Sequence, residues 1–176
     1  MARLVFGLMQ SLDGYVDHEA FEPDPVLFRH FIDHARHVKG GIYGRRTYEI
    51  MRYWETDDPE WTADFQEFAD VWRRQKKWVV SRTLKSVGPN ATLIASDVEA
   101  TVRRLKSEIE GELEVSGPDF AGQMTRAGLV DEFRLYVQPI VLGKGQPFFT
   151  GAVPKLRLTG HEVIGAGVVR LVYVPD

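Results

Sequence analysis

The most constraining feature of this sequence is the order in which short apolar segments and amphipathic segments follow one another. Through most of the chain, an apolar segment of strand length precedes a segment with apolar residues at helical spacing. Near the C-terminus the alternation stops, and strand-like segments follow one another directly. This order predicts a three-layer α/β fold with a mostly parallel central sheet and an antiparallel C-terminal hairpin. The predicted strands cover residues 3–9, 42–43, 78–80, 92–95, 113–115, 132–141, 156–164 and 168–174.

Capping signals mark the start of two of the predicted helices. Asp24 followed by Pro25 predicts the N-cap and the first residue of one helix. Ser96, with Glu99 three residues later, has the pattern of a capping box at the start of another. Two further helices are expected from apolar spacing, one through Phe65, Phe68, Ala69 and Trp72, the other through Phe120 and Met124.

Length and composition exclude several classes of protein. A chain of 176 residues predicts a single domain spanning residues 1–176. The absence of cysteine excludes a disulfide framework, a thiolate nucleophile and a Cys-bound metal. The net charge of −3 gives no general attraction to nucleic acid or to an anionic membrane. The N-terminal segment has the pattern of a strand and not of a signal peptide, so we expect a cytoplasmic protein.

Three turns that follow predicted strands share a composition suited to binding phosphate groups. Residues 44–47 supply a glycine, two arginines and a threonine, residues 81–83 are Ser-Arg-Thr, and residues 116–118 are Ser-Gly-Pro. Each turn also has an ordinary structural explanation, as a capped helix start, a polar turn or a strand-to-helix corner. Ligands of parallel sheets bind at the carboxyl ends of the strands. Three such turns on one edge therefore favour a bound, phosphate-bearing cofactor.

Three histidines in the first predicted helix raise the question of a metal site. His30, His34 and His37 are spaced four and three residues apart, which places them on one helical face. Imidazoles at this spacing are compatible with metal binding. We favour the alternative, in which this face is solvated, and we expect no bound metal.

The residues around these turns resemble the dihydrofolate reductase superfamily. SLDGYVD follows the first strand, GRRTYE the second and VVSRTL the third, and GLVDEFRLYVQPIVLGKGQPFF stands near the end. The branch that the chain most resembles is the reductase domain of bifunctional riboflavin-biosynthesis proteins and its stand-alone relatives, with similarity from residue 2 to residue 149. The resemblance implies a dihydrofolate reductase-like fold and an NADPH-dependent reductase that forms a homodimer.

The resemblance also implies how a cofactor would bind. The turn at 44–47 would hold phosphates, the turn at 81–83 would meet the adenosine 2′-phosphate, and the turn at 116–118 would lie under the pyrophosphate. The backbone at the end of the first strand would approach the nicotinamide. Arg82 favours NADPH over NADH because a guanidinium pairs well with a dianionic phosphate. The implied cofactor-binding residues are Met9, Gln10, Gly44, Arg45, Thr47, Ser81, Arg82, Thr83, Ser116 and Gly117.

Substrate-binding candidates lie in two loops. Asp24 is positioned like the acidic residue that grips the pteridine in dihydrofolate reductases, although its N-cap role explains it equally. Asp13 is expected either to orient a substrate group or to close an Asx turn. We take Asp13 and Asp24 as the catalytic candidates. Lys144, between two glycines, would meet a substrate phosphate or sit in a turn, and Asp13 and Lys144 are the substrate-binding candidates.

Aromatic residues flank an acidic stretch in the middle of the chain. Tyr53, Trp54 and Trp61 are compatible with a lid that stacks on a planar heterocycle. The alternative, a surface loop pinned by one buried tryptophan, is the one we favour.

Two residues depart from the family pattern and keep two functions open. Ser116 stands where many relatives carry glycine, and Asp119 would bring a carboxylate close to the pyrophosphate. The first hypothesis is an NADPH-dependent oxidoreductase that transfers a hydride to a small heterocyclic or carbonyl substrate. Reduction of 5-amino-6-(5-phosphoribosylamino)uracil in riboflavin biosynthesis is one named option. The alternative is a non-catalytic protein that binds a nucleotide or another small ligand on the same fold.

Overall fold

The central sheet of the described residues contains eight strands, drawn from the whole length of the chain. The computed structural model describes residues 1–17, 19–22 and 24–176. The strands are β1 (Arg3–Gln10), β2 (Tyr15–Val16), β3 (Gly41–Gly44), β4 (Lys77–Val80), β5 (Ala91–Ile94), β6 (Glu112–Ser116), β7 (Glu132–Val137), β8 (Gln146–Pro147), β9 (Leu156–Ile164) and β10 (Val168–Pro175). The helices are α1 (Pro25–His37), α2 (Arg45–Met51), the 3₁₀ helix η1 (Arg52–Glu55), α3 (Ala63–Arg74), α4 (Val98–Glu108) and α5 (Pro118–Arg126).

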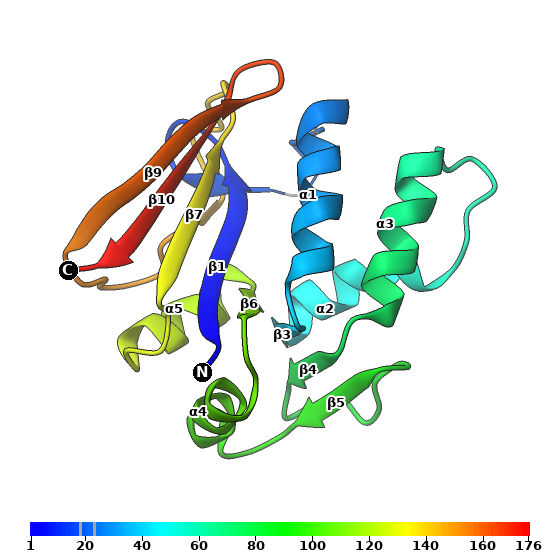
Figure 1. Ribbon diagram of the computed structural model, residues 1–176, viewed down its shortest axis with the longest axis vertical. Coiled ribbons are helices and arrows are strands. Elements are labelled where there is room, and N and C mark those ends of the chain that lie inside the picture. Colours follow the sequence, from blue (N-terminus) through cyan, green and yellow to red (C-terminus); the bar gives the residue numbers. More distant parts are fainter. Residues whose placement is uncertain (18, 23) are drawn as a thin grey trace.

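The topology of the sheet confirms the predicted fold class. Its strand order is β5-β4-β3-β6-β1-β7-β10-β9 (Figure 1). Neighbouring strands from β5 to β7 run parallel, whereas β10 and β9 are antiparallel to their neighbours. The short strands β2 and β8 form a separate antiparallel pair. All the carboxyl ends of the six parallel strands consequently lie at one edge of the sheet.

Helices pack on both faces of the sheet, which gives the three predicted layers. On one face, α4 and α5 cover a core in which Leu4 and Phe6 of β1 are buried. On the other face, Leu27 of α1 packs on Tyr136 of β7, and α3 packs against α1. The ring centroids of Phe28 in α1 and Phe65 in α3 lie 4.8 Å apart. None of the helices in the described ranges combines the length and apolar character needed to cross a membrane.

The two predicted helix starts have different outcomes. The Asp24 cap is confirmed, because its carboxylate accepts a hydrogen bond from the Leu27 N–H (2.8 Å). The capping box at Ser96 and Glu99 is wrong. Asp97, with φ of +50°, is the N-cap of α4, and the Ser96 hydroxyl donates to its carboxylate. Glu99 is one position too early to reach back to the cap and instead pairs with Arg103 (2.7 Å).

β7 is shorter than predicted, because the strand ends at Val137 and not at residue 141. Gln138 still donates its backbone N–H to the carbonyl of Gln10 (2.8 Å). Pro139 follows and has no N–H to continue the ladder. The chain turns there, and the Ile140 N–H bonds back to the Gln138 carbonyl (2.8 Å).

Candidate cofactor site at the carboxyl edge

The three predicted phosphate-binding turns lie side by side at the carboxyl edge. Gly44, the last residue of β3, pairs with Val80 of β4, and Tyr43 pairs with Ser116 of β6. The turns at 44–47, 81–83 and 116–118 follow directly from these strand ends. Their convergence, predicted from sequence, is confirmed.

Two of the turns approach each other so closely that a glycine is required. Gly117 is buried and has φ of +106°, a conformation that side chains disfavour. A Cβ on Gly117 would lie 2.6 Å from the Thr47 hydroxyl oxygen. At Gly44, a Cβ would lie 3.2 Å from the Cβ of Phe120. At Gly44 and Gly117 the backbone therefore carries no side chain and can be approached closely. Ser116 stays within β6 in the strand conformation, so it does not disturb this approach.

The carboxyl half of β1 has an open edge next to these turns. β6 pairs with β1 only as far as Phe6, opposite Val115, whereas β7 pairs with β1 up to Gln10. In the described part of the chain, no strand pairs with the β6 side of residues 7–10. The Gln10 carbonyl faces β7, and successive residues of a strand direct their backbone groups to opposite sides. The Met9 backbone groups therefore face the open edge.

Some polar side chains of the turns already have hydrogen-bond or ion-pair partners, and others have none. The Ser81 hydroxyl is buried and accepts hydrogen bonds from the N–H groups of Thr83 (3.1 Å) and Leu84 (3.0 Å), so it closes the turn. Arg45 pairs with Glu49 (3.1 Å). Arg82 is exposed and has no hydrogen-bond or ion-pair partner among the described residues. A free guanidinium at this rim is available for an anion.

Arg46 was counted in the 44–47 turn from the sequence but was not among the implied cofactor-binding residues. Arg46 is exposed, like Arg82, and it likewise has no hydrogen-bond or ion-pair partner within the described ranges. The signal was present in the sequence, because Arg46 lies between Arg45 and Thr47 in the same turn.

Asp13 and Lys144 are brought together at the end of β1. The Asp13 carboxylate accepts hydrogen bonds from the Ser11 hydroxyl (2.5 Å) and from the N–H groups of Leu142 (3.1 Å) and Gly143 (2.7 Å). The Ser11 hydroxyl, helped by the two N–H groups, holds the pKa of Asp13 below its usual value. Lys144 is the next residue along the tethered loop. Asp13 is thus an ionised anchor for this loop.

Asp24 lies apart from this pair and is engaged at both oxygens. One oxygen caps α1, and the other accepts from the Ala166 N–H (2.6 Å) in the turn between β9 and β10. The Ala166 N–H, together with that of Leu27, lowers the pKa of Asp24. A carboxylate held ionised in this way is a poor proton donor at neutral pH, so the geometry supports the structural explanation of Asp24.

Asp119 has a partner on β8 that orients it. Its carboxylate accepts a hydrogen bond from the side-chain amide of Gln146 (2.9 Å). The carboxylate is therefore turned toward β8.

Comparison with known proteins decides the family. A family profile described as the RibD C-terminal domain matches residues 2–170. The chain belongs to the RibD C-terminal domain family. It is 26% identical over 179 residues to the uncharacterized protein YyaP of Bacillus subtilis (strain 168), covering 97% of this chain and 94% of that protein.

Solved structures support the same fold for this RibD C-terminal domain. A protein of Shewanella sp. PV-4, described as a riboflavin biosynthesis protein, superposes on this chain with a TM-score of 0.77 at 22% identity. The match covers 100% of this chain and 99% of the Shewanella chain. The deaminase/5-amino-6-(5-phosphoribosylamino)uracil reductase of Thermotoga maritima superposes with a TM-score of 0.68 at 17% identity. That match covers 99% of this chain and 57% of the Thermotoga chain. At these identities the likeness shows the fold alone.

Two of the three histidines of α1, His30 and His34, face the sheet, whereas His37 is exposed and bonds to the Asp33 carbonyl of its own helix (2.6 Å). His30 Nε2 lies 3.0 Å from the Tyr136 hydroxyl, and His34 lies between Arg134 (3.3 Å) and Glu114 (3.7 Å). The interpretation of this helical face as solvated is wrong for His30 and His34, because polar side chains of β6 and β7 contact them. Among the described residues, no group of three His, Asp or Glu side chains is placed to hold a metal.

Tyr53 and Trp54 of η1 and Trp61 of the following loop pack on one another, and Trp54 also packs on α3. Tyr53 and Trp54 centroids lie 5.0 Å apart, and those of Trp54 and Trp61 lie 5.2 Å apart. The Trp61 indole N–H donates to the Tyr53 hydroxyl (2.7 Å), and Trp54 packs on Phe68 of α3 (4.9 Å). These contacts favour a pinned surface loop.

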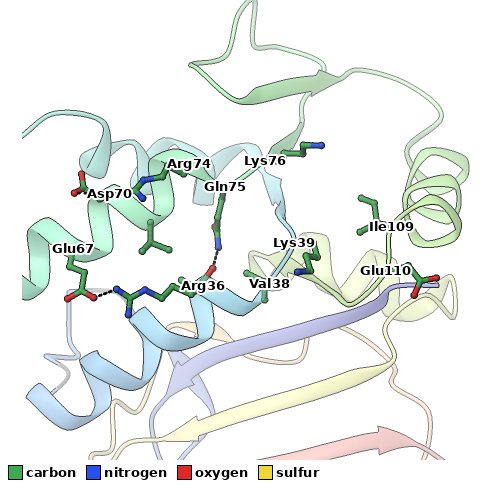
Figure 2. Close-up of a pocket in the computed structure, with 12 residues that line it drawn as sticks. Arg36, Val38, Lys39, Glu67, Asp70, Arg74, Gln75, Lys76, Ile109 and Glu110 are labelled. Carbon is green, nitrogen blue, oxygen red and sulfur yellow. Dashed lines mark hydrogen bonds and ion pairs between the residues drawn. The ribbon is translucent and has the colours of Figure 1, made fainter.

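A large open groove lies at the opposite, amino edge of the sheet. It has a volume of about 680 Å³ between the ends of α1 and α3 and the loop before β6 (Figure 2). Lys39 precedes β3, Lys76 precedes β4 and Glu110 precedes β6, which places the groove at the amino ends of these strands. The acidic Glu67 is already paired with Arg36, as Figure 2 shows. The groove is thus a mixed-charge surface away from the three turns.

Proposed function

We propose that this protein is an NADPH-dependent reductase of a small heterocyclic or carbonyl substrate. The observation that carries the proposal is the convergence of the three turns beside the open edge of β1. A dinucleotide needs bare backbone under its pyrophosphate, cationic side chains at its phosphates and a hydrogen-bonding partner for its nicotinamide amide. The turns offer Gly44 and Gly117 for the first, Arg46 and Arg82 for the second, and the Met9 backbone for the third.

The residues of this chain would position the reactants. NADPH, when bound, supplies the hydride, so the protein mainly binds and orients. In this proposal the Met9 backbone fixes the nicotinamide at the end of β1, and the loop anchored by Asp13 brings Lys144 to the same place. In this proposal the ionised Asp13 positions the loop, in place of orienting a substrate group, which was one of the two roles expected from the sequence. Asp24 fixes the start of α1 against the turn between β9 and β10.

Cofactor binding tests the proposal directly. A ligand at one hundred times its dissociation constant adds about 2.7 kcal/mol to the free energy of unfolding. For a domain of this size, NADPH should raise the melting temperature by roughly 5–10 °C. A clear shift with NADPH and a smaller one with NADH supports the proposal. No shift with either cofactor would refute it.

Arginine variants locate the phosphate contact. We expect Arg82→Ala to weaken NADPH binding about 10- to 100-fold, the value of a charge-assisted hydrogen bond, and to leave NADH binding unchanged. Arg74→Ala is the matched control, since Arg74 is exposed at the opposite edge and its nearest ion-pair partner is Asp70 at 3.9 Å. If Arg46→Ala reduces the preference for NADPH over NADH and Arg82→Ala does not, Arg46 is the residue that contacts the 2′-phosphate.

Two further properties follow from the family resemblance and are proposed with it. We propose a homodimer, which light scattering after size-exclusion chromatography tests, and a cytoplasmic location.

NADPH oxidation over a panel of pteridines, pyrimidines and quinones separates the reductase from a binding protein on the same fold. The orientation of Asp119 toward Gln146 supports the reductase, because it removes one reason to doubt cofactor affinity.

A further inference from the structure

Gln138 lies at the carboxyl end of β7, directly beside the end of β1. Its backbone N–H bonds to the Gln10 carbonyl (2.8 Å), and Pro139 turns the chain immediately afterwards. Although it is polar, only 8% of the residue is exposed. A strand-end glutamine buried to this degree needs a reason, because polar groups are normally buried only with hydrogen-bond partners.

The Gln138 carboxamide has no such partner in the described part of the chain. Its Nε2 atom is fully buried and makes no hydrogen bond. Its Oε1 atom also has no hydrogen bond to any described residue. The Nε2 donor and the Oε1 acceptor of Gln138 therefore both lack a partner among the described residues, which leaves them for a ligand.

The surroundings of Gln138 favour an organic ligand over a lone water molecule. Gln138 follows Tyr136 by two residues, so its side chain leaves β7 on the same face of the sheet. On that face, Met9, Leu27 and Val168 form an apolar cluster around Tyr136, and the Tyr136 hydroxyl is already bonded to His30. The charged side chain on the same face, Arg170 opposite Tyr136, is paired with Glu162 (2.8 Å). A buried water needs two to four polar partners. An apolar wall with one unpaired carboxamide is instead typical of a pocket for a flat heterocycle.

We propose that Gln138 determines substrate specificity by pairing with the lactam edge of a heterocyclic substrate. A carboxamide carries a donor and an acceptor side by side, and a lactam presents the complementary adjacent C=O and N–H. The lactam oxygen accepts from Nε2, and the lactam N–H donates to Oε1. The inference rests on the proposed function, because it places the substrate beside the end of β1, where the nicotinamide would lie.

The test compares two probes that differ in lactam character. 5,6-Diaminouracil carries lactam edges, whereas 5,6-diamino-1,3-dimethyluracil has the same ring but carries methyl groups in place of both lactam N–H hydrogens, so it cannot donate to Oε1. Calorimetry with saturating NADP⁺, and again without it, measures the affinity of each probe. We expect the wild type to bind 5,6-diaminouracil at least ten times more tightly. Gln138→Met, which keeps the side-chain volume, should remove this preference and leave NADP⁺ affinity unchanged.

Gln123→Met is the matched control, because Gln123 is exposed on α5. The side-chain amide resonances of Gln138, identified by their absence from the spectrum of Gln138→Met, should shift when 5,6-diaminouracil is added. Equal binding of the two probes by the wild type, no binding of either, or an unchanged preference in Gln138→Met would overturn the inference. Failure of NADP⁺ to bind the wild type would count against the proposed function separately.

Discussion

Replacing Gly117 with alanine tests whether the bare backbone at the carboxyl edge matters. Gly117 has φ of +106°, and a residue with a side chain held in such a region costs about 1–3 kcal/mol. The new Cβ would also lie 2.6 Å from the Thr47 hydroxyl oxygen, well inside ordinary contact. Overpacking of this kind costs about 1–3 kcal/mol more. We expect a total loss of about 2–6 kcal/mol, from the same two effects, in the free energy of unfolding.

Gly167→Ala separates the two contributions. Gly167 has a similar φ of +114°, but a Cβ there would meet nothing within 4 Å. It should therefore lose only the backbone part, about 1–3 kcal/mol, and keep its affinity for NADPH. Gly117→Ala should weaken NADPH binding by at least tenfold as well, because its methyl group occupies the approach to the pyrophosphate.

Urea unfolding and a fluorescence titration with NADPH measure both quantities. Adding Thr47→Ala to Gly117→Ala should recover part of the lost stability, since it removes the colliding oxygen and leaves the Thr47 Cβ position at an ordinary 3.5 Å. Equal stability losses in Gly117→Ala and Gly167→Ala, with NADPH affinity unchanged in both, would refute the reasoning.

Two further predictions concern buried charges. Lys77 donates to the Trp72 (2.5 Å) and Gln75 (3.0 Å) carbonyls at the end of α3, and burial lowers its pKa to about 8. The unfolded chain then binds more protons between pH 8 and the ordinary 10.5, so stability should rise by about 1–2 kcal/mol from pH 8 to 9.5. Urea midpoints should show this rise in the wild type and not in Lys77→Met, and parallel curves would contradict it. Arg134 pairs with Glu112 (2.9 Å) and with the buried Glu132 (2.6 Å). Arg134→Met should cost about 1.5–3 kcal/mol, because it removes charged hydrogen bonds from the buried Glu132, which keeps only its pairing with Arg3 (3.0 Å). Arg104→Met, from an exposed pair, should cost at most about 1 kcal/mol. Similar costs in urea unfolding would argue against this.

Local patterns were sufficient to predict the architecture and the three turns. Strand and helix alternation fixes a parallel sheet, and a parallel sheet gathers the carboxyl ends of its strands at one edge. The sequence alone therefore predicts that the turns at 44–47, 81–83 and 116–118 lie close together. The Asp24 cap was equally local, because its signal lies in two adjacent residues.

Features that depend on distant contacts could not be predicted in the same way. His30 and His34 lie beside the apolar stripe of α1, but only the tertiary structure shows that Tyr136 and Glu114 rise from the sheet to meet them. The positive φ of Asp97, which moves the start of α4, has no clear sequence signal. Gln138 did have one, since it is a polar residue directly before Pro139 near the end of a predicted strand.

The most direct test of the central claim is a titration of ¹⁵N-labelled protein with NADPH, followed through its backbone amide resonances. We predict that the largest shifts fall on Met9 and on the amides of residues 44–47, 81–83 and 116–117. Shifts gathered instead around Lys39 and Lys76, at the amino-edge groove, would contradict a dinucleotide site at the carboxyl edge of the sheet.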